Sequence, residues 1–285
     1  MVNRNPSKEK IVDLSIELLI LIVVIFSISP ILILILDSFK SYSEIITIPP
    51  TILPRKWSLS NFIEMAERVD VVTMTANSFI VSGSITISTL FLATLAGYAF
   101  AKFEFTGKDK IFMLTISKLM IPTIVLVIPW TSMMTRAGLL DSLLAAVLPY
   151  LSGAWTIFFM RQYILQLPDD LLDSARIDGA GELRIFFSIV LPLIRPALAT
   201  AAIVNFLWGW NEFLWPLLVL NSKQNFVLSI GLAYVKYSGG VMTEASVNYA
   251  MLAAFSLIYS LPVLLVYLLL ARQFVESIVL SGLQR

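Results

Sequence analysis

The residues of this chain that could take part in chemistry gather in one polar stretch, from Leu167 to Pro196. The sequence contains no histidine and no cysteine, so the commonest general base, the commonest metal ligand and any thiolate are missing. It also lacks a Gly-rich phosphate loop ending in Lys-Ser or Lys-Thr, so another subunit must bind any ATP that is used. The pattern predicts recognition of a partner rather than catalysis. The charged residues of the stretch are Asp169, Asp170, Asp173, Arg176, Asp178, Glu182, Arg184 and Arg195.

Local rules predict a helix, a glycine turn and a second helix within this stretch. Pro168 suits a first helical turn, and Asp169 with the acid after it places negative charge near the positive end of the helix dipole. Gly179 suits the left-handed position that ends a helix. A second helix is expected from Glu182 towards Pro192. The stretch is too polar to cross a bilayer, so we expect a docking element on one membrane face.

The rest of the composition indicates an all-α integral membrane protein. The chain has 285 residues, of which 58% are hydrophobic and 14% charged, against about 25% charged in soluble domains. Its net charge of +1 gives no reason to expect a nucleic acid partner. A bilayer core needs about 20 apolar residues of helix, and six runs qualify. These predicted transmembrane helices are Leu18–Leu36, Ser78–Ala101, Ile111–Thr131, Ser142–Met160, Ala197–Leu220 and Ala245–Ala271.

Six spans place both termini on one side, and the excess of Lys and Arg on that side predicts that it is cytoplasmic. We therefore expect a cytoplasmic N-terminus (residues 1–13), a transmembrane domain (14–271) with a cytoplasmic loop at 161–196, and a cytoplasmic tail (272–285). The first run is too long for a signal peptide and no cleavage site follows it, which favours a retained anchor.

Smaller patterns predict local structure. Asn61 is expected to cap a short outer helix, with Glu64 as its capping-box partner. Gly83, Ala93 and Gly97 favour close helix packing in the second span over contact with a substrate.

Two features within the spans could contact a transported solute. In the fifth span, Asn205, Trp208, Glu212 and Trp215 recur at helical spacing, and aromatic faces suit stacking on sugar rings. The alternative is that Glu212 lies at the outer boundary, where a carboxylate reaches water. Lys118 lies within the third span and could instead extend to the inner surface or pair with a partner subunit. As the only basic residue within the spans, it favours a neutral sugar over a phosphate ester.

The stretch Asp173-Ser174-Ala175-Arg176-Ile177-Asp178-Gly179-Ala180 resembles the cytoplasmic coupling motif of ATP-binding-cassette (ABC) importer permeases. That motif begins with Glu-Ala-Ala, and here an Asp and a Ser replace its first two residues. In the carbohydrate-importer branch a Leu-Pro pair follows, as Leu191-Pro192 does here. Trp210-Asn211-Glu212-Phe213, Ala96–Ala101 with Phe105-Thr106-Gly107, and Trp57–Phe62 resemble further elements of that branch. The likeness is closest to the six-span permease subunits of maltose and trehalose type importers, whose C-terminal tail this chain does not match.

The resemblance implies a non-catalytic subunit that forms half of a translocation pathway in a prokaryotic cell membrane. The implied partners are a second homologous permease, two ATPase subunits that carry ATP and Mg, and an extracytoplasmic sugar-binding protein. The loop Asn221–Glu244 would meet that binding protein through Tyr237, Gly239 and Gly240. The implied substrate is a disaccharide or oligosaccharide such as maltose or trehalose, and the alternatives are another solute (a glycerol phosphate or a polyamine) or a stand-alone secondary transporter.

The implied ATPase-coupling residues are Leu171, Leu172, Asp173, Ser174, Ala175, Arg176, Asp178, Gly179 and Ala180. The implied path residues are Asn205, Trp208, Asn211, Glu212 and Trp215.

Overall fold

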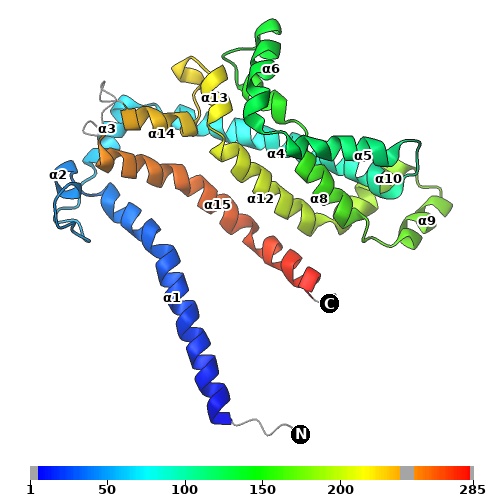
Figure 1. The fold of residues 1–285 in the computed structure, drawn as a ribbon, viewed down its shortest axis with the longest axis horizontal. Helices are drawn as coiled ribbons and strands as arrows, with labels where there is room; N and C mark the ends of the chain where they lie inside the picture. Colours follow the sequence, from blue (N-terminus) through cyan, green and yellow to red (C-terminus); the bar gives the residue numbers. More distant parts are fainter. Residues whose placement is uncertain (1–5, 238–246, 283–285) are drawn as a thin grey trace. The chain divides into compact units, whose positions relative to one another are not determined.

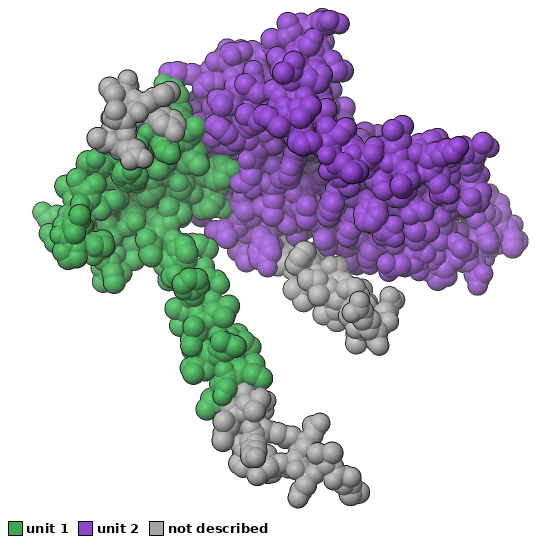
Figure 2. All heavy atoms as spheres, in the orientation of Figure 1, with its two compact units in different colours: residues 1–69, 232–260 green, residues 70–231, 261–285 purple. Residues whose placement is uncertain are grey.

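A computed structural model describes residues 6–237 and 247–282, and every regular element within them is a helix. The chain forms two compact units, coloured separately in Figure 2. Unit 1 comprises residues 1–69 and 232–260, and unit 2 comprises residues 70–231 and 261–285. The polar stretch and most of the predicted spans belong to unit 2.

Unit 2 is built around the long helix α4 (Val71–Lys102), against which α8 (Ala154–Ile164) and α12 (Arg195–Asn211) pack (Figure 1). The Asp70 side chain caps α4 by accepting the backbone N–H of Thr73 at 3.0 Å. Hydrogen bonds from the Thr73 hydroxyl and this N–H hold the pKa of the Asp70 carboxyl below its usual value. The other helices of unit 2 are α5 (Lys108–Ser117), α6 (Thr123–Arg136), α7 (Leu143–Val147), α9 (Asp169–Ile177), α10 (Glu182–Ile185), α11 (Leu191–Leu193) and α13 (Leu214–Val219).

Small residues allow α4 to approach its neighbours closely, as the sequence predicts. A Cβ added at Gly97 would lie 3.0 Å from the backbone nitrogen of Arg161 in α8. A Cβ at Gly209 of α12 would lie 3.2 Å from the Cα of Ser82. A Cβ added at Gly83 would have no neighbouring atom within 4 Å. Close packing therefore requires a glycine at Gly97 but not at Gly83. Close backbone contact of this kind replaces the hydrophobic effect between helices in lipid.

Three helices are long and apolar enough to cross a membrane without a break: residues Leu14–Ser38, Val71–Lys102 and Tyr249–Leu269. Three further candidates are bent pairs of helices, so the described residues hold between three and six spans rather than six continuous ones. Residues Lys108–Met120 meet α6 at 102°, Leu143–Tyr150 meet α8 at 46°, and Glu182–Leu193 meet α12 at 79°. Pro122, Pro149 and Pro196 lie beside these bends and remove backbone donors there.

Unit 1 contains α1 (Pro6–Ser38), α2 (Tyr42–Ile45) and α3 (Ser60–Arg68). The predicted capping role of Asn61 is wrong, because α3 begins at Ser60 and the residue at its cap position, Leu59, makes no side-chain cap. The buried Asn61 amide instead donates to the carbonyl oxygens of Ser38 and Lys40, both at 2.8 Å. It therefore fixes the chain that leaves α1. Helix α14 (Leu228–Tyr237) begins in unit 2, and α15 (Tyr249–Gly282) begins in unit 1.

Candidate functional site

The polar stretch forms the predicted helix, turn and second helix. Helix α9 spans Asp169–Ile177 and is preceded by Pro168. Gly179 lies two residues beyond its end, and its φ of +81° is the left-handed conformation that glycine favours. The N–H of Ala180 donates to the carbonyl of Ala175, and that of Gly179 donates to Arg176, each at 3.0 Å. This pair of bonds is a Schellman motif, which stops a helix and reverses the chain.

One side of the returning helix, Glu182–Leu193, is buried in the core of unit 2. Its middle, Phe186–Val190, adopts the wider π-helical form. Ile185, Phe186, Val190 and Ile194 are at most 1% exposed. They pack with Leu172 of α9 and with residues of α4, α8 and α12 in one cluster. The stretch is therefore a firmly seated part of unit 2 rather than a loose loop.

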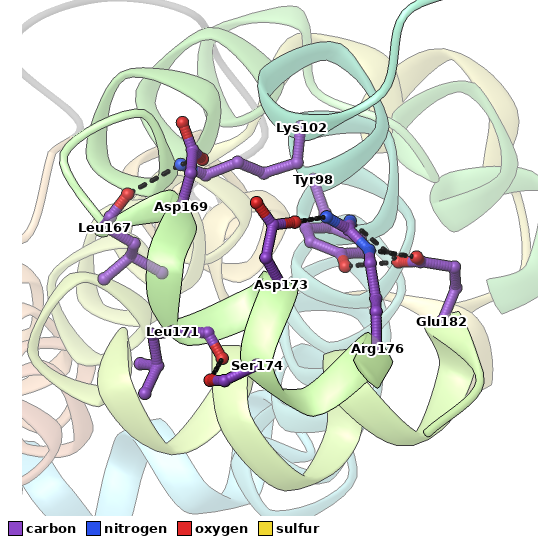
Figure 3. A network of polar contacts seen from close by, with 9 residues as sticks. All are labelled: Tyr98, Lys102, Leu167, Asp169, Leu171, Asp173, Ser174, Arg176 and Glu182. Carbon is purple, nitrogen blue, oxygen red and sulfur yellow. Dashed lines mark hydrogen bonds and ion pairs between the residues drawn. The ribbon is translucent and has the colours of Figure 1, made fainter. Parts of the chain in front are cut away.

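Lys102, in the last turn of α4, ties the start of α9 to that long helix (Figure 3). Its ammonium group donates to the carbonyl of Leu167 and to the carboxylate of Asp169, both at 2.6 Å. The Lys102 side chain is 5% exposed, so the lysine of this ion pair is buried while its carboxylate partner is exposed to solvent. The ammonium holds the pKa of the Asp169 carboxyl below its usual value.

Arg176 ties the end of α9 to the second helix and to α4. Its guanidinium donates to Asp173 at 2.6 Å and to Glu182 at 2.7 and 3.4 Å. The hydroxyl of Tyr98, from α4, donates to Glu182 at 2.7 Å, and Figure 3 shows the three side chains converging. Both ends of α9 are thus attached to α4, the first directly through Lys102 and the second through Glu182. We call these six polar residues the tether: Tyr98, Lys102, Asp169, Asp173, Arg176 and Glu182.

The tether should be insensitive to pH near neutrality and should weaken in acid. Arg176 first, and the Tyr98 hydroxyl after it, hold the pKa of Glu182 below its ordinary 4.5. A depressed carboxyl pKa contributes stability above the unfolded-state pKa and loses it as the pH falls through the folded-state pKa. We therefore expect hydrogen exchange of the α9 amides to be constant from pH 7 down to about pH 5 once corrected for intrinsic rates, and to accelerate below pH 4.5.

The matched variant for this pH prediction is Glu182→Gln, which keeps the shape of the side chain and removes its charge. In that variant the accelerated exchange should already be present at pH 7. An acid profile identical to that of the wild-type chain would contradict the assignment of the transition to Glu182.

The structure divides the predicted coupling residues between an inner and an outer side of α9. Leu172 is fully buried, so its side chain is not available for the predicted contact with a partner. Ala175 and Ala180 pack against the same cluster but are only partly buried, so their predicted contacts stay predictions. The sequence could not show this, because helical spacing does not say which apolar side faces the parent unit. The outer side carries Leu171, 41% exposed, and Ile177, 85% exposed. The exposed Ser174 lies between them and Asp178 follows, while Asp173 and Arg176 belong to the tether.

Sequence reasoning missed four tether residues as site residues: Tyr98, Lys102, Asp169 and Glu182. Lys102 ends a long helix, Asp169 starts the polar helix, and Glu182 opens the next one after the turn. Ile177 was also missed as an outward residue. A β-branched apolar side chain next to the helix end of a polar stretch is the signal that could have found it.

A cavity of about 290 Å³ lies within unit 2, between the bent third span, α8 and α12. Of the predicted path residues, Asn205 and Trp208 line it. Asn205 exchanges a hydrogen bond with Thr156 at 3.1 Å, and the Trp208 ring meets Tyr150 edge-on with centroids 4.4 Å apart. The full lining is Ile85, Thr89, Lys118, Leu119, Ile121, Thr123, Leu126, Trp130, Tyr150, Ser152, Gly153, Ala154, Trp155, Thr156, Val204, Asn205 and Trp208.

The other predicted path residues do not line this cavity, because the fifth span breaks. Helix α12 ends at Asn211, and α13 starts at Leu214, so the stripe expected on one helix is divided. The carboxylate of Glu212 accepts the N–H of Trp215 at 3.1 Å. Trp215 is 1% exposed and donates from its indole to Ala145 at 3.0 Å. The Asn211 amide donates back to Leu207 at 2.7 Å.

The loop after α13 is held by a carboxylate, while the predicted binding-protein contacts lie mostly outside the described residues. Asp141, at φ +59°, accepts the backbone N–H groups of Asn221 and Ser222 at 2.8 and 2.9 Å. These bonds, and above all the Ser222 hydroxyl, lower the pKa of Asp141 well below its usual range. Gly239 and Gly240 lie outside the described residues. Tyr237 ends α14, and its side chain is not described.

A family model for the binding-protein-dependent transport system inner membrane component matches residues 89–276, which include the whole coupling stretch and most of unit 2. The chain belongs to this family. The prediction that the chain is an ABC importer permease is therefore confirmed. This permease contains α9, the tether and the cavity.

Relatives of known name cover most of the chain. It is 36% identical over 258 residues to the arabinooligosaccharides transport system permease protein AraQ of Halalkalibacterium halodurans, covering 90% of each. It is 33% identical to the diacetylchitobiose uptake system permease protein NgcG of Streptomyces coelicolor, covering 87% of this chain and 82% of the relative. It is 34% identical to the sn-glycerol-3-phosphate transport system permease protein UgpE of Pectobacterium atrosepticum, covering 72% of each.

A solved structure shows the same fold. One chain of a bacterial ABC transporter involved in the import of the acidic polysaccharide alginate superposes with a TM-score of 0.80 at 21% identity. The match covers 94% of this chain and 98% of that one. The predicted all-α permease fold is therefore confirmed.

Proposed function

We propose that this permease forms half of the membrane pathway of an ATP-driven importer for short oligosaccharides, and that α9 is its coupling helix. Three of its relatives are permeases for arabinooligosaccharides, diacetylchitobiose and sn-glycerol-3-phosphate, and two of these solutes are saccharides. The observation that carries the proposal is the outer side of α9. Leu171 and Ile177 expose apolar surface on a helix whose other side is fixed to α4.

In the proposed mechanism, movement of the ATPase subunits is transmitted through α9 to α4. An ATPase subunit grips the outer side of α9 around Leu171, Ser174 and Ile177, where apolar area and a small hydroxyl side chain fit a groove. When the ATPase subunits close on ATP, α9 carries the end of α4 with it through Lys102 and Tyr98. Because α8 and α12 pack directly on α4, unit 2 moves as one body against the second permease, which gives alternating access to the pathway between them.

The proposed assembly includes a second homologous permease, two ATPase subunits that hold ATP and Mg, and an extracytoplasmic binding protein. In the proposed topology both termini face the cytoplasm, with boundaries near residues 13 and 271, and the 161–196 loop is cytoplasmic. This chain is the proposed non-catalytic permease subunit, because its relatives are transport-system permease proteins. ATP hydrolysis belongs to the partner.

A second candidate substrate is a small phosphate ester. The likeness to a glycerol phosphate permease supports it, as does the presence of Lys118 on the cavity wall. The test is the ATPase activity of the reconstituted complex with its binding protein, measured against arabinooligosaccharides, chitobiose, maltose, trehalose, digalacturonate and glycerol 3-phosphate. We expect one saccharide to stimulate hydrolysis several-fold. Stimulation by glycerol 3-phosphate alone would select the second candidate, and no stimulation by any of them would contradict both.

A further inference from the structure

The wall of the cavity in unit 2 carries a positive charge. Lys118 starts the short helical turn Lys118–Met120, where the third span bends by 102°. Its ammonium group lies 3.5 Å from the carbonyl oxygen of Ser152, at the edge of hydrogen-bond distance. Among the described residues, no aspartate or glutamate lines the cavity and none forms an ion pair with Lys118. The described residues of the wall therefore include no acidic side chain that neutralises Lys118.

The bend brings two helix ends to the same wall. Helix α6 starts at Thr123 and runs for 14 residues, and both Thr123 and Leu126 of its first turns line the cavity. The N-terminal end of a helix carries the equivalent of about half a positive charge. Broken membrane helices present such ends to anionic groups of transported solutes. The helix Lys108–Met120 brings its negative C-terminal end to the same bend, so the two helix ends offset each other. The net positive charge at this wall is that of Lys118.

The remaining wall offers hydrogen bonds and flat apolar faces. Tyr150 is 8% exposed, and its hydroxyl finds no hydrogen-bond partner among the described residues. Trp130, Trp155 and Trp208 place indole rings on the same wall. Aromatic faces of this kind suit the apolar faces of a pyranose ring.

We propose that this cavity binds a sugar unit that bears a carboxylate or a phosphate, with Lys118 facing the anion. The inference rests on the proposed transport function and specifies its substrate class. A cavity of about 290 Å³ is at the lower end of the size of ligand pockets, which suits a single sugar unit or the end of a chain. The position of Lys118 on the cavity wall reverses the expectation from sequence, in which a single basic residue favoured a neutral sugar.

The test measures binding to the assembled transporter, without the binding protein, in phosphatidylcholine nanodiscs. Three of the chain's six tryptophans line the cavity, so intrinsic fluorescence reports occupancy. The probes are two matched pairs: digalacturonate with galactobiose, and glucose 6-phosphate with glucose. We expect at least one anionic probe to bind about tenfold more tightly than its neutral partner, with an affinity that falls as salt rises. Lys118→Met should remove that preference, and Lys110→Met, an exposed lysine on α5 outside the cavity, should keep it.

Each outcome decides the inference. Equal binding of the neutral and anionic probes, or an unchanged preference in Lys118→Met, would overturn it. Loss of probe binding in phosphatidylglycerol nanodiscs would assign the cavity to a lipid headgroup and overturn it as well. The proposed transport function fails separately, if the permease does not assemble with an ATPase or if no solute stimulates hydrolysis.

Discussion

Replacing Gly179 with valine is expected to abolish most ATP-driven uptake while leaving the amount of permease in the membrane unchanged. Gly179 has a φ of +81°, which a side chain makes unfavourable by roughly 1–2 kcal/mol, and more for a β-branched residue. That energy corresponds to about a 5- to 30-fold shift in the equilibrium away from the turn that ends α9, and to a larger shift for valine. No atom lies within 4 Å of a Cβ added there, so the cause is backbone conformation and not a clash. Uptake per assembled complex is the measurement.

Two control variants distinguish the effect of the left-handed backbone at Gly179 from the effect of replacing a glycine as such. Gly179→Asn should retain most of the uptake, because asparagine tolerates the left-handed region. Gly181→Ala should be close to wild type, since Gly181 has a φ of −70° and open space around it. Equal losses in Gly179→Val and Gly179→Asn would show that the turn geometry does not matter for coupling.

Replacing Arg176 with methionine is expected to separate ATP hydrolysis from transport. The change keeps the length and apolar character of the stem and removes the contacts to Asp173 and Glu182. Arg176 and Glu182 are 34% and 40% exposed, so solvent screening reduces the value of these contacts to about 1 kcal/mol, or about fivefold in the population of the tethered state. We expect uptake to fall about fivefold while basal ATPase activity of the complex persists.

The matched control for the tether is Arg184→Met, which removes an exposed arginine from the neighbouring α10. It should leave uptake near the wild-type level. Arg176→Lys should recover only part of the activity, because an ammonium group cannot reproduce the forked contact with Glu182. If Arg176→Met and Arg184→Met reduce uptake equally, charge on this face matters and the tether does not.

Local rules were sufficient to predict the helix, the turn and the returning helix of the coupling stretch. Proline before α9, acids in its first turn and glycine after its end each act over a few residues, so one sequence contains the needed information. Which side of α9 faces inward depends on contact with α4 and α8. Leu172 and Ile177 are both apolar, and only the packing of unit 2 buries the first and exposes the second.

The break in the fifth span has a local cause, a proline, although the helical spacing of its polar and aromatic residues predicts one continuous helix. The ring of a proline clashes with the carbonyl four residues before it. Pro216 therefore disfavours helix at Glu212, where the backbone is extended, with a ψ of 122°. The freed carbonyl accepts the Ser229 hydroxyl at 2.7 Å instead. The stripe of polar and aromatic residues is divided at this point, and only Asn205 and Trp208 line the cavity.

The central claim is that the outer side of α9 contacts an ATPase subunit. Because the chain has no cysteine, Ile177→Cys introduces a single thiol at a position that is 85% exposed. The thiol is labelled with a photoactivatable maleimide and irradiated in membranes that contain the whole transporter. We predict a cross-linked product with the ATPase subunit, and none from Ile128→Cys, a position on α6 that is 80% exposed. A labelled Ile177→Cys permease that yields no ATPase product, in a complex that still hydrolyses ATP, would contradict the claim.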